Sequence, residues 1–121
     1  MTKTQNSKQY DLEDRTLVFA KEIRGFVKSI KKDMANLEDG KQLIRASGSV
    51  GANYIEANEA LSKKDFLMRI KICRKEAKES KYWLNLIHAD SDSIIAAKKT
   101  ELEQEAGELT NIFGAILRKS E

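Results

Sequence analysis

Hydrophobic residues recur every three or four positions along four stretches of the chain, which is the spacing of an amphipathic helix. In the first stretch, residues 11–32, the inward positions are Leu12, Thr16, Phe19, Ile23, Phe26 and Ile30. In the last stretch, residues 100–118, they are Leu102, Ala106, Leu109, Phe113 and Ile116. Because two further stretches between them show the same spacing, the pattern predicts four helices and an all-α fold.

The second stretch is rich in small residues, and it continues to about Leu61. One seam steps by four and three residues through Leu43, Ser47, Val50, Tyr54, Ala57 and Leu61. A neighbouring stripe at the same spacing consists of Ile44, Gly48, Gly51 and Ile55. Glycine inside a helix costs roughly 1 kcal/mol relative to alanine, so its presence indicates close helix approach. We expect other helices to cover both faces.

The third stretch, from about residue 62 to residue 87, divides into three faces when it is placed on a helical wheel. The core seam is Phe66, Ile70, Cys73, Ala77, Ser80, Leu84 and Ile87. The basic face carries Lys64, Lys71, Arg74, Lys75, Lys78 and Lys81, with Tyr82 at its end. The third face mixes apolar and acidic residues, namely Ile72, Glu76, Glu79, Trp83 and Leu86. An aromatic residue ringed by polar groups is typical of a protein contact surface, although Trp83 and Leu86 could instead widen the core.

Short connections between the helices predict an up-and-down bundle. We expect a turn at residues 34–37, with Asn36 and Asp39 capping the second helix. Ser62, followed three residues later by Asp65, predicts a capping box that opens the third helix.

A further break at residues 90–93 separates the third helix from the fourth. Thr100 with Glu103 suggests a second capping box, and Ile94 and Ile95 would then lie in the loop or in a first turn.

The chain has 121 residues, no proline and one cysteine. This length fits one domain, which we place at residues 11–121 behind a flexible polar tail at residues 1–10. No apolar run approaches membrane-spanning length and no disulfide framework is possible within the chain, so we expect a cytoplasmic protein that does not enter membranes.

The net charge of +3 is modest, but its distribution is uneven. Residues 63–81 hold eight basic and three acidic side chains, whereas the rest of the chain holds fourteen and sixteen. The basic stripe is long enough to follow phosphates along a nucleic-acid strand. The alternative is a lysine face that is only solvated.

Catalytic chemistry finds little support in the sequence. One histidine, His88, and one cysteine, Cys73, cannot supply a closed zinc site, and no Glu-x-x-His pairs are present for a di-iron site. We expect no metal, no cofactor and no catalytic residue. Glu56, Glu76 and Glu79 could converge with Arg45 and Asn53 between the second and third helices, as a satisfied polar network or, less simply, as an acid–base pair.

Two motifs resemble a known family, the bacterial four-helix bundle proteins encoded in intervening sequences of 23S rRNA genes. The first is the run RASGSVGANYIEA at residues 45–57, and the second is KEAKESKYWL at residues 75–84. The positions that match the family pattern are Arg45, Ser49, Asn53, Glu56, Glu76, Glu79 and Trp83.

The resemblance implies an up-and-down bundle that assembles as a homo-oligomer, with a pentamer as the expected form. Members are often labelled ribosomal-protein-like, and no catalytic activity is attached to the family. Related bundles are the accessory variability determinants of diversity-generating retroelements, where a basic pentamer binds nucleic acid and a reverse transcriptase.

The leading hypothesis is therefore a non-enzymatic homo-oligomer that binds structured RNA or another nucleic acid through the basic face of the third helix. A second hypothesis is a scaffold that binds a protein partner, such as a reverse transcriptase, through the face around Trp83. An enzyme that uses Glu56, Glu76 and Glu79 is a more distant alternative. The last alternative is a protein without a defined role that is carried as a passenger of an intervening sequence.

Overall fold

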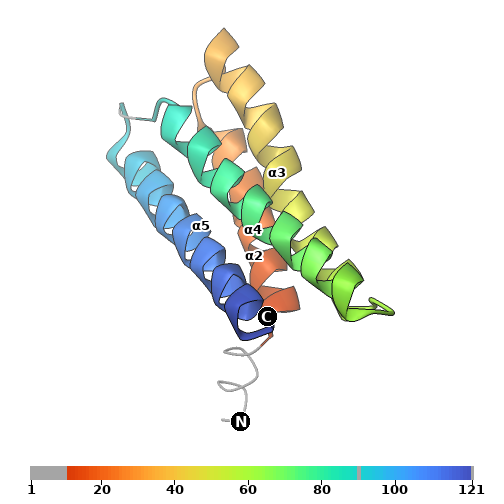
Figure 1. Ribbon diagram of the computed structural model, residues 1–121. Helices are drawn as coiled ribbons and strands as arrows, with labels where there is room; N and C mark the ends of the chain where they lie inside the picture. The colour runs from red at the N-terminus through yellow and green to blue at the C-terminus, as the bar shows by residue number, and fades with distance from the viewer. Residues whose placement is uncertain (1–10, 90, 121) are drawn as a thin grey trace.

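Four helices pack side by side in the computed structural model, which describes residues 11–89 and 91–120. They are α2 (Leu12–Ser29), α3 (Met34–Asn58), α4 (Lys63–Leu86) and α5 (Ser93–Ser120). Each helix runs antiparallel to the one before it, and α5 returns to the side of α2 (Figure 1). The predicted all-α, four-helix fold is confirmed. The tail predicted at residues 1–10 lies outside the described residues.

The core occupies the axis of the bundle and is built from the predicted seams of all four helices. Its largest fully buried side chains include Phe19, Ile23, Leu43, Val50, Ile70, Leu84, Leu102, Leu109 and Phe113. The prediction that Leu61 continues the buried seam of the second helix is wrong. Its side chain is 100% exposed, because α3 already ends at Asn58. The other seam residues of α3 are buried, apart from Tyr54, which is half-buried and packs against Phe113.

The connection between α2 and α3 differs from the prediction. Helix α2 ends at Ser29 because Ile30 adopts an extended conformation, and α3 begins at Met34, where Asp33 caps it by accepting a hydrogen bond from the Asn36 amide at 2.8 Å. The turn predicted at residues 34–37 is therefore wrong, and Asn36 is not a cap.

Asn36 is instead buried, and its side chain links two loops by hydrogen bonds. Its Nδ2 donates to the carbonyl oxygens of Lys31 and His88, and its Oδ1 accepts from the His88 amide, each at 3.0 Å. A buried side-chain amide must satisfy its donors and acceptor, and backbone groups of the two connections do so here. Asn36 thus ties the start of α3 to the residues that follow α4.

The two predicted capping boxes have opposite outcomes. Ser62 caps α4 as predicted, because its side chain accepts from the Asp65 amide at 3.1 Å. The box at Thr100 is wrong, since α5 begins seven residues earlier at Ser93 and the Thr100 hydroxyl donates to the Ala96 carbonyl. Asp92 supplies the cap by accepting from the amides of Ile94 and Ile95, which lie in the first turn of α5.

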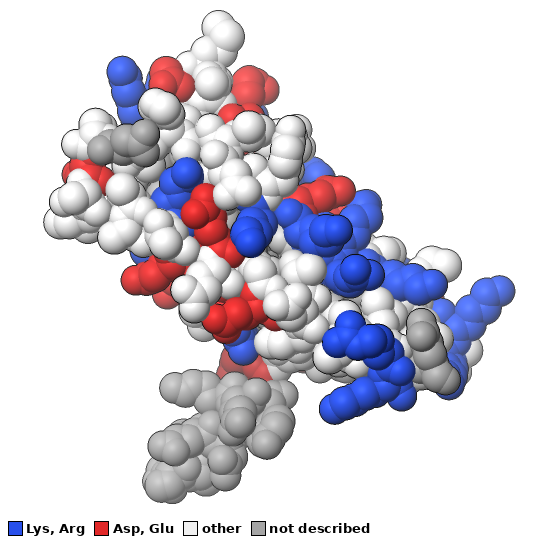
Figure 2. Space-filling view, turned by 60° about the vertical axis from the view of Figure 1, so that its left-hand side comes forward, with Lys and Arg blue, Asp and Glu red and all other residues white. Residues whose placement is uncertain are grey.

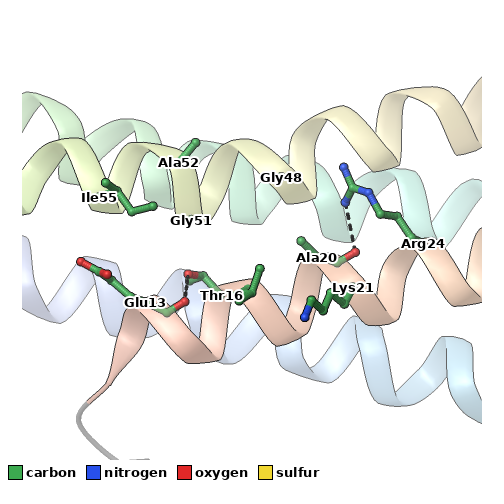
Figure 3. A pocket seen from close by; sticks show the side chains of 10 residues that line it. Glu13, Thr16, Ala20, Lys21, Arg24, Gly48, Gly51, Ala52 and Ile55 are labelled. Atoms are coloured by element: carbon green, nitrogen blue, oxygen red, sulfur yellow. Dashed lines mark hydrogen bonds between the residues drawn. The ribbon is translucent and has the colours of Figure 1, made fainter.

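The second stripe of α3 is only partly covered, contrary to the expectation that both faces are packed. At its centre Gly51 allows α2 to approach closely, because a Cβ there would lie only 2.8 Å from Thr16 Oγ1. Farther out, α2 and α3 leave a shallow groove of about 340 Å³, and Ile55 on its rim is 49% exposed (Figure 3). The groove is open because the residues that line it from α3 include Gly48, Gly51 and Ala52.

Candidate nucleic-acid interface

The basic face predicted for the third helix lies on the outer surface of α4. Because α4 turns its core seam toward the other helices, residues on the opposite side of the helical wheel point outward. All six predicted side chains are exposed: Lys64, Lys71, Arg74, Lys75, Lys78 and Lys81. In the view of Figure 2, lysine and arginine side chains gather toward the right, whereas toward the left fewer of them are visible and they lie among acidic side chains.

Acidic side chains near this face are few. Among the described residues, Lys75 is the only one of the six with a carboxylate within 4.0 Å, its partner being Glu76 at 3.6 Å. A shallow hollow of about 350 Å³ is lined by Lys71, Arg74, Lys75 and Lys78 together with Glu79. Cations that are close together and lack carboxylate partners create a positive potential that attracts phosphate groups.

The basic surface continues from α4 onto α5, which the sequence did not reveal. Two glycines of α5, two turns apart, lie beneath basic side chains of α4. A Cβ at Gly107 would lie 3.5 Å from Lys81 Nζ, and one at Gly114 would lie 3.9 Å from Arg74 Nε. Glycine at both positions leaves room for these long side chains to extend across α5.

Arg118 of α5 joins Arg74 over Gly114. Its Nη1 lies 3.5 Å from the position that a Cβ of Gly114 would occupy, so guanidinium groups from two helices converge on one place. In the part of the chain that the structure describes, neither has a carboxylate within 4.0 Å. Two adjacent guanidinium groups without acidic partners are suited to hold a phosphate, whose oxygens match their geometry.

The predicted polar network between α3 and α4 forms in part. Arg45 Nη1 lies 3.8 Å from Glu76 Oε1, and Arg45 Nη2 lies 3.9 Å from Glu79 Oε1. These distances are ion-pair contacts rather than hydrogen bonds. Glu76 is 6% exposed, whereas Arg45 lies at the surface, so the arginine covers a buried carboxylate.

The remaining predicted members of the network do not join it. The side chain of Asn53 accepts from Arg69 Nη1 at 3.0 Å and donates to the Ser49 carbonyl at 2.9 Å, closer to the α3–α4 turn. The side chain of Glu56 is exposed and makes no hydrogen bond or ion pair with a described residue. The three glutamates therefore do not form one cluster.

Two polar atoms near the Trp83 face are buried without a hydrogen-bond partner among the described residues, namely Glu76 Oε1 and Trp83 Nε1. Such atoms are uncommon, because each costs about 1–3 kcal/mol of desolvation. The Trp83 ring is half-buried and packs against the core, while Leu86 on the same face is half-exposed. Trp83 thus widens the core, as one of the two interpretations predicted, and it also borders an exposed surface. The protein contact surface stays a prediction.

Cys73 and His88 lie in settings that do not favour catalysis. Burial raises the pKa of the Cys73 thiol to about 12, and the thiol donates to the Val50 carbonyl at 3.4 Å. His88 is exposed, and its backbone binds Asn36. No group of three or more His, Cys, Asp or Glu side chains with metal-binding geometry occurs within residues 11–89 and 91–120.

None of the helices in the described ranges combines the length and hydropathy that crossing a membrane requires.

These features define a class of protein, an antiparallel four-helix bundle with a cationic outer face. The chain belongs to the 23S rRNA-intervening sequence protein family, whose pattern matches residues 8–115. The resemblance drawn from the motifs of α3 and α4 is thereby confirmed.

A crystal structure at 1.70 Å resolution shows a similar bundle. It is a protein with unknown function from the S23 ribosomal protein family of Bacteroides thetaiotaomicron VPI-5482. The two chains are 29% identical with a TM-score of 0.75, and the match covers 88% of this chain and 94% of the other. No curated protein matches the sequence.

Proposed function

We propose that this protein is a non-enzymatic, homo-oligomeric bundle that binds structured RNA or another nucleic acid through the outer face of α4. The observation that carries the proposal is the charge arrangement on that face. Of its six cations, five have no carboxylate within 4.0 Å in the described part of the chain. Over a length of seventeen residues, at about 1.5 Å per residue, the face spans roughly 25 Å, which is enough to meet several successive phosphates.

Binding rather than catalysis is supported by the state of the reactive groups. The Cys73 thiol is buried and its raised pKa keeps it protonated, so it is not available as a nucleophile. Glu56, Glu76 and Glu79 do not converge on an open pocket. The proposal therefore assigns a charged binding surface to the protein and no catalytic role to the described residues.

The test is the mass of the purified, nuclease-treated protein, measured by light scattering with and without a structured RNA at low and at high salt. We expect an added mass at low salt that is released at high salt, since phosphate contacts are sensitive to salt. The triple variant Lys71→Glu, Lys75→Glu, Lys78→Glu should lose this binding.

The matched control is Lys21→Glu, Lys28→Glu, Lys41→Glu, which changes the formal charge equally on exposed positions of α2 and α3. It should retain binding. If both triple variants lose RNA binding to the same extent, the net charge and not the face of α4 is responsible, and the proposal is wrong. Undiminished binding by the α4 variant would also contradict it.

A second candidate function is a protein contact at the face around Trp83, either between copies of this chain or with another protein such as a reverse transcriptase. The specific observation is that two buried atoms on this face, Glu76 Oε1 and Trp83 Nε1, have no hydrogen-bond partner among the described residues, while Leu86 on the same face is half-exposed. A contact with a second subunit could complete such a surface. The pentamer implied by the family resemblance is one form of this assembly.

The same light-scattering measurement tests this contact. Trp83→Ala should lower the mass of the assembly, whereas Leu17→Ala, which removes a half-exposed side chain from α2, should leave it unchanged. A wild-type monomer at all concentrations would exclude the homo-oligomer. An oligomer whose mass does not change when RNA is added would favour one of two other functions. The protein would then be a scaffold for a protein partner, or a passenger of the intervening sequence with no nucleic-acid ligand.

A further inference from the structure

One aromatic side chain lies on the basic face itself. Tyr82 is 57% exposed, unlike Phe66 and Trp83, the other aromatic residues of α4, which pack against the core. It follows Lys78 by four residues and Lys75 by seven, so the three side chains share one side of the helix. The cationic face therefore ends in an exposed aromatic ring.

The Tyr82 ring is held by its neighbour. Its centroid lies 5.1 Å from that of Trp83 with an interplanar angle of 73°, an edge-to-face contact. This arrangement is favourable for aromatic pairs, and Trp83 is itself fixed by the core. A ring that is already oriented loses less conformational entropy when a ligand packs on it.

We infer that the nucleic acid bound along α4 contains unpaired nucleotides and that one of their bases stacks on Tyr82. This inference rests on the proposed function and adds the class of ligand. Lys75 and Lys78 hold the phosphates next to that base, while Tyr82 offers its face to the base. Successive bases of a duplex are stacked on each other and cannot accept an inserted ring without unstacking, whereas bases of loops, bulges and single strands can.

The expected gain is large enough to measure. Stacking of one base on an aromatic side chain strengthens binding by about 5- to 150-fold, as judged from alanine substitution. Because every base has an aromatic face, the preference is for unpaired nucleotides and not for a particular sequence. The lysines would bind paired and unpaired phosphates alike, so the preference depends on Tyr82.

The experiment compares a short fluorescently labelled single-stranded oligoribonucleotide with the blunt duplex of the same sequence, by anisotropy at one salt concentration. The variants are Tyr82→Ala, Tyr82→Phe and Val18→Ala. Val18 is the control because its side chain is similarly exposed and lies on α2, outside the basic face and the Trp83 face. Circular dichroism checks that each variant stays folded.

Wild-type protein should prefer the single strand, and Tyr82→Ala should lose at least about 5-fold in affinity for it while its affinity for the duplex is unchanged. Tyr82→Phe and Val18→Ala should keep the wild-type preference. Emission of Trp83, the one tryptophan of the chain, should also change on binding of the single strand and respond less in Tyr82→Ala.

Equal effects of Tyr82→Ala on both probes, or none on either, would overturn the inference while leaving charge-driven binding by α4 in place. Absence of binding to both probes by the wild-type protein would instead overturn the proposed function, and the inference with it.

Discussion

Two charged regions of this bundle are built in opposite ways. Along the seam between α2 and α5, basic side chains meet carboxylates: Arg15 Nε and Nη2 lie 2.8 Å from Glu105 Oε2 and Glu108 Oε1, and Lys98 Nζ lies 3.0 Å from Glu22 Oε1. On the outer face of α4, only one of six basic side chains has such a partner within the described residues. Both regions carry exposed or partly exposed basic side chains, but only in the seam are most of these side chains paired with carboxylates.

The difference separates structural charges from available ones. A cation paired with carboxylates across a helix interface stabilises that interface, and its field is largely cancelled at a distance. A cation without a partner adds little to the fold and leaves its field in the solvent, where a phosphate can meet it. The comparison therefore predicts that substitutions in the seam change stability, and that substitutions on α4 change binding.

The largest effect on the fold is expected from Arg15→Ala. Arg15 forms hydrogen-bonded ion pairs with Glu105 and Glu108, and its hydrogen bond to Glu105 is the main cause that raises its pKa above the ordinary value. Because the side chain is about one-third exposed, solvent screens part of the interaction. We expect a loss of about 1–2 kcal/mol in the free energy of unfolding, measured by urea denaturation.

Lys64→Ala is the control for Arg15→Ala, since it removes one exposed charge from α4. It should change the free energy of unfolding by less than about 0.5 kcal/mol. RNA affinity should follow the opposite order and fall only in Lys64→Ala. A drop in RNA affinity for Arg15→Ala without unfolding would show that the two regions are not separate.

A smaller effect, confined to binding, is expected from Arg118→Ala. Arg118 converges with Arg74 over Gly114, and the loss of one phosphate contact should lower the salt dependence of RNA binding by about one unit of the log–log slope. Unfolding in urea should be unchanged. Lys119→Ala, which removes the adjacent charge, is the control, and an equal decrease in slope for both variants would argue against a site at Gly114.

Local patterns predicted the parts of this structure that depend on neighbouring residues. The buried seams follow from helical spacing, and Ser62 was correctly predicted as a cap because its partner, the Asp65 amide, is three residues away. The basic face of α4 could be predicted for the same reason, since all of its residues lie on one helix.

Two errors were local, because the ends of helices at Asn58 and Ser93 were misplaced, whereas the other errors and omissions involve partners that are distant in sequence. Asn36 resembled a turn residue, but its hydrogen bonds reach His88, 52 residues away. Arg15 binds Glu105, 90 residues away, and the contribution of Arg118 depends on Arg74 in another helix. One sequence gives the period of each helix, yet the pairing of side chains across helices depends on how the helices are aligned.

Lowering the pH should affect the stability of the seam between α2 and α5 but not binding by α4. This effect should be smaller than those of Arg15→Ala and Arg118→Ala. Hydrogen bonds from Gln104 and then from Arg15 lower the pKa of Glu108 below its ordinary value of 4.5. A carboxyl group whose pKa is lower in the folded state stabilises the fold above its unfolded pKa, and this contribution disappears as the pH falls through the folded value. Glu108→Gln should therefore lower the melting temperature slightly at neutral pH and flatten its decline below about pH 4.5.

Glu59→Gln, an exposed position with no ion pair among the described residues, should keep the wild-type profile. The face of α4 carries basic side chains and no hydrogen bond to Glu108, so the affinity of the folded protein for a phosphate-bearing ligand should not fall with the stability of the seam. A parallel fall of both would mean that carboxylates also control the face of α4.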